Sequence, residues 1–184
     1  KGEWKRKDFM GVELYNKTMG IMGLGRIGME VAKRCLAFGM RVKAYDPFLS
    51  KEVADQVGVE LVAKEEIYKN ADYITVHVPL TEETTGMISD KEFEMMKSGV
   101  RVINCARGGI INEEALARAL ESGKVAGAAL DVYTEEPPKD LKLAKVNNMV
   151  LTPHLGASTE EAQVNVAIEI AHQVADALSG KGIR

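Results

Sequence analysis

A glycine-rich turn between an apolar run and an amphipathic segment constrains the fold of this chain more than any other feature. Residues 19–22 (Met-Gly-Ile-Met) are typical of a short buried strand, and residues 23–28 (Gly-Leu-Gly-Arg-Ile-Gly) follow directly. Apolar residues then recur with helical spacing up to Gly39, a typical helix stop: Ile27, Val31, Cys35 and Phe38. The sequence therefore predicts a strand, a tight glycine turn and a helix.

The spacing of the three glycines indicates a site for the pyrophosphate of a dinucleotide. Gly23 would allow the tight turn, Gly25 would let the phosphates approach the backbone, and Gly28 would let the helix pack against the strand. The free N–H groups and the positive dipole end of the helix would face the phosphates.

Asp46 ends a second predicted strand, residues 41–46, and lies eighteen residues after Gly28. A carboxylate there can accept hydrogen bonds from the adenosine ribose, and it would repel a 2′-phosphate, so the sequence favours NAD over NADP. The alternative is ordinary turn glycines beside a surface acid. The combination of strand, glycines, helix and acid favours the cofactor site.

Composition excludes several classes of protein. With 184 residues, 46% of them hydrophobic and 28% charged, the chain can form one globular domain with a core. The net charge of −3 argues against nucleic acid as a partner, and no apolar run approaches the roughly 18–20 residues that span a bilayer. Two cysteines make no disulfide framework and indicate the cytoplasm. We expect no metal site, because no His/Cys/Asp cluster has ligand spacing.

Strand and helix patterns alternate along the chain, which predicts an α/β fold: a Rossmann-type, doubly wound parallel sheet with helices on both faces. Further strands are expected at 59–62, 73–78, 100–104, 125–130 and 149–151, and further helices at 50–56, 64–69, 89–96 and 113–122. Capping boxes are predicted for two helices, at Ser89 with Glu92 and at Ser158 with Glu161, and Asn112 is expected to cap a third.

A long helix is expected within residues 158–180, with two apolar stripes. The main stripe runs from Val164 to Leu178, and the second contains Val166, Ile170 and Ala177. Two interpretations stay open: a wide face that packs on the core, or a second stripe that packs on a domain or subunit outside this chain.

Three candidate catalytic residues each follow a predicted strand, where ligands bind in open α/β sheets: Arg107, Glu136 and His154. An imidazole can take and return the proton of a substrate hydroxyl, and a carboxylate beside it orients the ring. A guanidinium can hold a substrate carboxylate through two hydrogen bonds and polarise the adjacent carbonyl. Together they predict oxidation of a 2-hydroxy acid. For His77, near the expected cofactor cleft, we expect a structural role.

Four motifs resemble those of the D-2-hydroxyacid dehydrogenases: residues 23–28, residues 104–109 (Asn-Cys-Ala-Arg-Gly-Gly), residues 130–132 (Leu-Asp-Val), and the pairs Glu136-Pro137 and Pro153-His154. The resemblance covers essentially the whole chain. Within the family, residues 2–10, 134–138 and 154–159 are most similar to the members that oxidise 3-phosphoglycerate.

The resemblance implies roles for individual residues. Arg107 would bind the substrate carboxylate and carbonyl oxygen, Glu136 would tune His154 as the general acid/base, and Asp131 would contact the nicotinamide carboxamide. Val78 stands where close relatives often have a threonine, so a hydroxyl contact to NAD is not expected there. Further residues would line the cofactor through backbone or close contact: Arg26, Ile27, Cys105, Ala106, Arg107, His154, Leu155, Gly156 and Ala157.

The resemblance also implies that residues 1–184 are an NAD-binding domain and that the substrate-binding domain lies outside this chain. Residues 1–17 would form a linker and dimer arm, with Trp4, Phe9 and Met10 reaching a second copy. Two alternatives stay open, a glyoxylate or hydroxypyruvate reductase and a non-catalytic NADH-sensing protein similar to the corepressors of this fold. Formate dehydrogenases carry glutamine where this chain has Glu136, which disfavours that activity.

Overall fold

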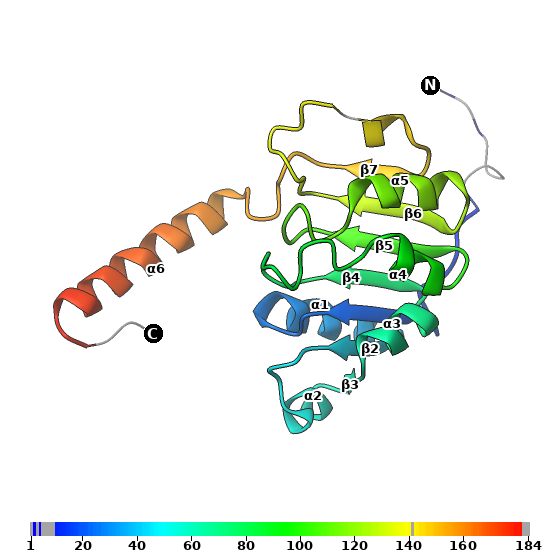
Figure 1. Cartoon of the computed structure of the whole chain (residues 1–184). Helices are drawn as coiled ribbons and strands as arrows, with labels where there is room; N and C mark the ends of the chain where they lie inside the picture. The colour runs from blue at the N-terminus through cyan, green and yellow to red at the C-terminus, as the bar shows by residue number, and fades with distance from the viewer. Residues whose placement is uncertain (1, 3, 5–9, 141, 182–184) are drawn as a thin grey trace.

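The computed structural model describes residues 2, 4, 10–140 and 142–181. Their strands form one parallel sheet in the order β3-β2-β1-β4-β5-β6-β7 (Figure 1). The strands are β1 (Thr18–Met22), β2 (Arg41–Tyr45), β3 (Glu60–Leu61), β4 (Tyr73–Val76), β5 (Val100–Asn104), β6 (Val125–Leu130) and β7 (Met149–Leu151). The predicted Rossmann-type sheet is confirmed.

The helices alternate with these strands as the sequence predicted. They are α1 (Arg26–Ala37), α2 (Lys51–Gln56), α3 (Lys64–Asn70), α4 (Asp90–Met95), α5 (Glu113–Glu121) and α6 (Glu160–Leu178). A short 3₁₀ helix, η2 (Lys142–Lys145), was not expected. The strand predicted for residues 73–78 was too long by two residues, since β4 ends at Val76.

The core has two parts, one on each face of the sheet. On one face, α3, α4 and α5 bury Ile67, Phe93 and Leu116 against the strands. On the other face, α1 packs on β1 and β2, α2 packs beside β3, and both helices contribute small residues such as Ala32 and Ala54. Helices therefore lie on both faces. Alternate residues of β5 are only half-buried. The helices of this second face, α1 and α2, lie over β1, β2 and β3 and do not cover β5.

Local hydrogen bonds set the helix starts. Ser89 N donates to the Glu92 carboxylate at 3.1 Å in the predicted capping box of α4, and Asn112 Oδ1 accepts from Ala115 N at 2.9 Å at the start of α5. The capping box predicted for α6 is wrong by one position. Its N-cap is Thr159, whose hydroxyl accepts from Ala162 N at 3.1 Å, because the Ser158 N–H is used in the preceding turn.

Helix α6 projects away from the sheet, as the orange-to-red ribbon in Figure 1 shows. None of its residues is buried, and Ile168 is 52% exposed. A wide face packed on the core of this chain is therefore the wrong interpretation, because the residues of both apolar stripes are exposed. No helix in the described ranges combines the length and apolar character needed to cross a membrane.

Candidate active site

A cleft of about 640 Å³ opens at the carboxyl ends of β1, β4 and β5. It is lined by residues from the turns after these three strands, at positions 25–27, 77–80 and 105–107. The strand order reverses between β1 and β4, and ligands bind at such a switch point in open α/β sheets. Seven of the predicted cofactor residues therefore line one cleft: Gly25, Arg26, Ile27, Val78, Cys105, Ala106 and Arg107.

The glycine turn after β1 is shaped by close backbone contacts. Gly23 has φ +94°, and a Cβ there would lie 2.6 Å from the carbonyl oxygen of His77. A Cβ on Gly28 would collide with the carbonyl oxygen of Gly23. A Cβ on Gly25 would meet no protein atom within 4 Å. Gly23 and Gly28 thus serve the packing of the turn, while Gly25 leaves open space beside the cleft.

The first turn of α1 suits an anionic ligand. No side chain caps this helix, and its first turn holds no acidic residue. By contrast, α2, α3, α4, α5 and α6 each carry at least one Asp or Glu in their first turn. An acid there neutralises the positive helix end, so its absence from α1 leaves the N–H groups and the dipole available to a phosphate.

Asp46 follows β2 and braces the glycine turn. One carboxylate oxygen accepts a hydrogen bond from Leu24 N at 2.8 Å, and the other accepts from Phe48 N at 2.9 Å. The side chain is half-buried at the end of the strand next to β1. This places Asp46 beside the turn, and its contact with a ribose stays a prediction.

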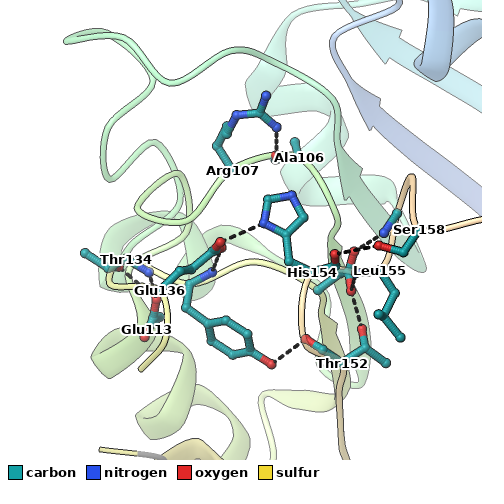
Figure 2. Close-up of polar contacts among 12 residues, drawn as sticks. Ala106, Arg107, Glu113, Thr134, Glu136, Thr152, His154, Leu155 and Ser158 are labelled. Atoms are coloured by element: carbon teal, nitrogen blue, oxygen red, sulfur yellow. Dashed lines mark hydrogen bonds and ion pairs between the residues drawn. The ribbon is translucent and has the colours of Figure 1, made fainter. Parts of the chain in front are cut away.

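Glu136 and His154 form a close pair (Figure 2). Glu136 Oε2 lies 2.7 Å from His154 Nδ1, and Glu136 Oε1 accepts a hydrogen bond from Tyr133 N at 3.0 Å. The bonds from His154 and Tyr133 hold the pKa of the Glu136 carboxyl below its usual range, so the group is a carboxylate at neutral pH. In the described residues, His154 Nε2 has no hydrogen-bond partner, which leaves it free to exchange a proton with a ligand.

His154 has an unusual backbone conformation, with φ +55°, in the turn after β7. Asp131, only 5% exposed, holds this turn: its carboxylate accepts from Leu155 N at 2.7 Å and from Gly156 N at 2.8 Å. The Thr152 hydroxyl donates to the same carboxylate at 2.6 Å. Burial raises the pKa of Asp131, but these three hydrogen bonds outweigh it and leave the pKa lower than usual. A nicotinamide contact by Asp131 stays a prediction.

Arg107 lies in a loop that a buried asparagine holds. Asn104, 2% exposed, donates from Nδ2 to Arg107 O at 2.8 Å and accepts from Ala106 N at 2.9 Å. The guanidinium donates to Ala106 O at 2.6 Å, and Figure 2 shows it on the imidazole side of the Glu136–His154 pair. The exposed guanidinium keeps further N–H groups available for a ligand carboxylate.

The structure adds residues that the sequence did not single out. Asn104, Glu113 and Thr134 hold the loops that carry Arg107 and Glu136, and Tyr133 OH donates to Thr152 O at 2.9 Å. Asn104 and Thr134 lie in stretches that resemble the family, residues 104–109 and 134–138, whereas Glu113 had no such signal. His77 Nε2 lies 3.0 Å from Thr75 Oγ1, and burial lowers the pKa of this imidazole. His77 also lines the 640 Å³ cleft, so its structural role stays a prediction.

Comparison with known proteins decides the family. The family model described as D-isomer specific 2-hydroxyacid dehydrogenase, NAD binding domain, matches residues 1–156. The chain belongs to this family. As an NAD-binding domain of the D-isomer specific 2-hydroxyacid dehydrogenases, it is 57% identical over 182 residues to the D-3-phosphoglycerate dehydrogenase of Rattus norvegicus. That match covers 99% of this chain and 34% of the rat protein, so the chain spans about a third of this relative's length.

Solved dehydrogenases share the fold. A glyoxylate reductase from Paecilomyes thermophila is 37% identical, with a TM-score of 0.89 over 95% of this chain and 53% of that structure. A D-lactate dehydrogenase from Aquifex aeolicus, solved with NAD and lactic acid, is 34% identical, with a TM-score of 0.85 over 94% of this chain and 56% of that structure. NAD is the cofactor of this domain family.

Proposed function

We propose that this chain is the cofactor-binding part of an enzyme that oxidises 3-phosphoglycerate to 3-phosphohydroxypyruvate with NAD⁺, the first step of serine synthesis. The observation that carries the proposal is the 2.7 Å contact between Glu136 Oε2 and His154 Nδ1, with Arg107 on the imidazole side of this pair. The match to D-3-phosphoglycerate dehydrogenase over 99% of this chain supports the choice of substrate.

The described residues fit NAD. The open space at Gly25 and the uncapped start of α1 suit the pyrophosphate, and Asp46 suits a ribose without a 2′-phosphate. The remaining wall would come from Arg26, Ile27, Val78, Cys105, Ala106, Gly156 and Ala157. When bound, NAD⁺ accepts the hydride from C2 of the hydroxy acid.

The residues of this chain would manage the proton and the charges. His154 Nε2 takes the proton of the C2 hydroxyl, while Glu136 holds Nδ1 and stabilises the imidazolium that forms. Arg107 binds the substrate carboxylate and polarises the developing C2 carbonyl. The hydroxyl proton goes to His154 as the C2 hydride leaves, and the product is a 2-oxo acid.

We place the rest of the substrate site in a domain outside this chain, and we propose that the enzyme is a cytoplasmic homodimer. Trp4 and Met10 are 92% and 83% exposed, which suits an arm that packs on a second copy. Phe9, the third residue expected in this arm, lies outside the described residues. The apolar stripes of α6 would pack on parts of the protein beyond this chain.

The substrate is tested with the full-length protein by following NADH oxidation with phosphohydroxypyruvate, hydroxypyruvate, glyoxylate and pyruvate. We expect the highest kcat/KM with phosphohydroxypyruvate. A preference for glyoxylate or hydroxypyruvate would leave the proposed site residues in place but would show that the proposed substrate is wrong. The similarity to a glyoxylate reductase makes this activity the second candidate. NADH binding without turnover of any of the four would favour a sensor.

The proton-transfer role predicts the effect of His154→Ala in the full-length protein. We expect kcat to fall by about 10²–10⁴-fold, because a general acid/base contributes that much. His172→Ala is the control and should leave kcat unchanged, since His172 lies on α6 outside both of its apolar stripes. An unchanged kcat in His154→Ala, measured by the same NADH assay, would remove His154 from the mechanism.

A further inference from the structure

The loop that carries Glu136 is held from outside the site by helix α5. Glu113 Oε1 accepts two hydrogen bonds from one residue, Thr134: one from its backbone N at 2.7 Å and one from its hydroxyl at 2.8 Å. Charge-assisted bonds of this kind are short and stronger than neutral ones. Figure 2 shows Glu113 and Thr134 beside Glu136.

The helix gives this contact a fixed base. Asn112 caps α5, and the next residues on its inner face, Ala115 and Leu116, are fully buried in the core. In the loop after β6, residues 131–133 are buried, whereas residues 134–136 are exposed and lie outside any helix or strand. Glu113 therefore transfers the rigidity of the helix to the loop at Thr134.

The loop leaves little room for Glu136 to move once Thr134 is held. Tyr133 N donates to Glu136 Oε1 at 3.0 Å, so the residue before Thr134 orients the carboxylate directly. Gly108, in the loop that carries Arg107, lies so close that a Cβ there would collide with Tyr133 O. The loop that carries Glu136 thus contacts both α5 and the loop that carries Arg107.

Glu113 itself does not face the cofactor cleft. It lines a different cleft, of about 370 Å³, together with Glu114, Arg118 and Tyr133. It is absent from the lining of the 640 Å³ cleft at the ends of β1, β4 and β5. Its two hydrogen bonds to Thr134 connect Glu113 to the loop that carries Glu136.

We propose that Glu113 is a positioning residue for the Glu136–His154 pair and acts by holding Thr134. The inference rests on the proposed function for its catalytic consequence, but not for its structural part. A displacement of reacting groups by about 1 Å can cost on the order of 10² in rate. Because Glu113 does not line the cofactor cleft, loss of its bonds to Thr134 should lower kcat more than it weakens cofactor binding.

A simpler role for Glu113 would be to stabilise the start of α5, where any acid is favourable. Glu114 provides the matched control, because it also lies in the first turn of α5 but makes no hydrogen bond to the loop in the described structure. Glu113→Ala and Glu114→Ala therefore remove the same charge from the same helix end. Only the first removes the hold on Thr134.

The experiment uses the full-length protein. For Glu113→Ala we expect kcat to fall by about 10–100-fold, with the NAD⁺ dissociation constant within about twofold of wild type. Glu114→Ala should behave as wild type. Glu113→Gln keeps one acceptor oxygen and should recover part of kcat. Hydrogen exchange followed by mass spectrometry should show faster exchange of the 133–136 amides in Glu113→Ala only.

Equal kcat and equal exchange in Glu113→Ala and Glu114→Ala would overturn the proposal. If the wild-type protein turns over no 2-hydroxy acid, the proposed function fails, and the exchange data still decide whether Glu113 holds the loop. If Glu113→Ala does not fold, Thr134→Val removes one of the two bonds. Wild-type kcat and exchange in that variant would also overturn the proposal.

Discussion

At the residue scale, the glycines of the turn after β1 differ in what an added side chain would meet: the protein itself or only a bound ligand. A Cβ on Gly28 would collide with backbone, whereas one on Gly25 would meet no protein atom within 4 Å. The backbone at Gly25, with φ −69° and ψ −163°, is one that any residue can adopt. A methyl group at Gly25 would therefore conflict only with a ligand.

We accordingly expect Gly25→Ala to weaken NAD⁺ binding by about tenfold or more, which corresponds to about 1.4 kcal/mol of binding free energy. The same substitution should lower the free energy of unfolding by less than about 1 kcal/mol. Gly28→Ala should instead lower the free energy of unfolding by about 1–3 kcal/mol, because it overpacks the helix against the strand. Calorimetric titration and urea denaturation measure the two effects. Wild-type affinity in Gly25→Ala would mean that the phosphates do not approach this residue.

At the scale of elements, polar residues at strand ends fold back to hold the loops of the site. Asn104, at the end of β5, holds the loop with Arg107, and Asp131, directly after β6, holds the turn with His154. Asp46, directly after β2, holds the glycine turn in the same way. The strands thus position the site through their last side chains as well as through the direction of the sheet.

Helix α6 has no buried residue, unlike the elements packed in the core, and substitutions of two isoleucines test this difference. Ile74 on β4 is 0% exposed and Ile168 on α6 is 52% exposed. In the 184-residue chain, Ile74→Ala should lower the free energy of unfolding by about 2–5 kcal/mol, and Ile168→Ala by less than about 0.5 kcal/mol. Urea denaturation measures both. A large loss in Ile168→Ala would show that α6 packs on this domain in solution.

At the scale of the whole molecule, Asp131 links stability to pH. Its pKa is lowered in the fold from a reference value of 3.8, so its contribution is present above that value and is lost as the pH falls through the folded pKa. Asp131→Asn should lower the free energy of unfolding by about 1–3 kcal/mol at pH 7, because hydrogen bonds to a buried charge are weakened. The difference from wild type should shrink below about pH 4.

Urea denaturation at a series of pH values measures this effect. Asp55→Asn is the control, because Asp55 lies exposed on α2. A difference between wild type and Asp131→Asn that stays constant from pH 7 to below pH 4 would mean that the carboxylate charge does not hold the turn after β7.

Much of the fold was predictable from the sequence, because its signals are local. The glycine turn, the alternation of strands and helices, and the caps at Ser89 and Asn112 depend on residues within a few positions of one another. The cap of α6 was missed by one residue, since Ser158 and Thr159 are both good N-caps and the turn before them decided between them.

The sequence by itself determined the sheet, the place of the cofactor cleft and the strand ends that carry Arg107, Glu136 and His154, because parallel strands bring their carboxyl ends to one edge. Only the tertiary structure decided what holds those residues. The bonds from Thr134 to Glu113 and from Gly156 to Asp131 join positions 21 and 25 residues apart, and no local pattern specifies them. It also decided that α6 is left unpacked, since the burial of an apolar stripe depends on which other elements reach it.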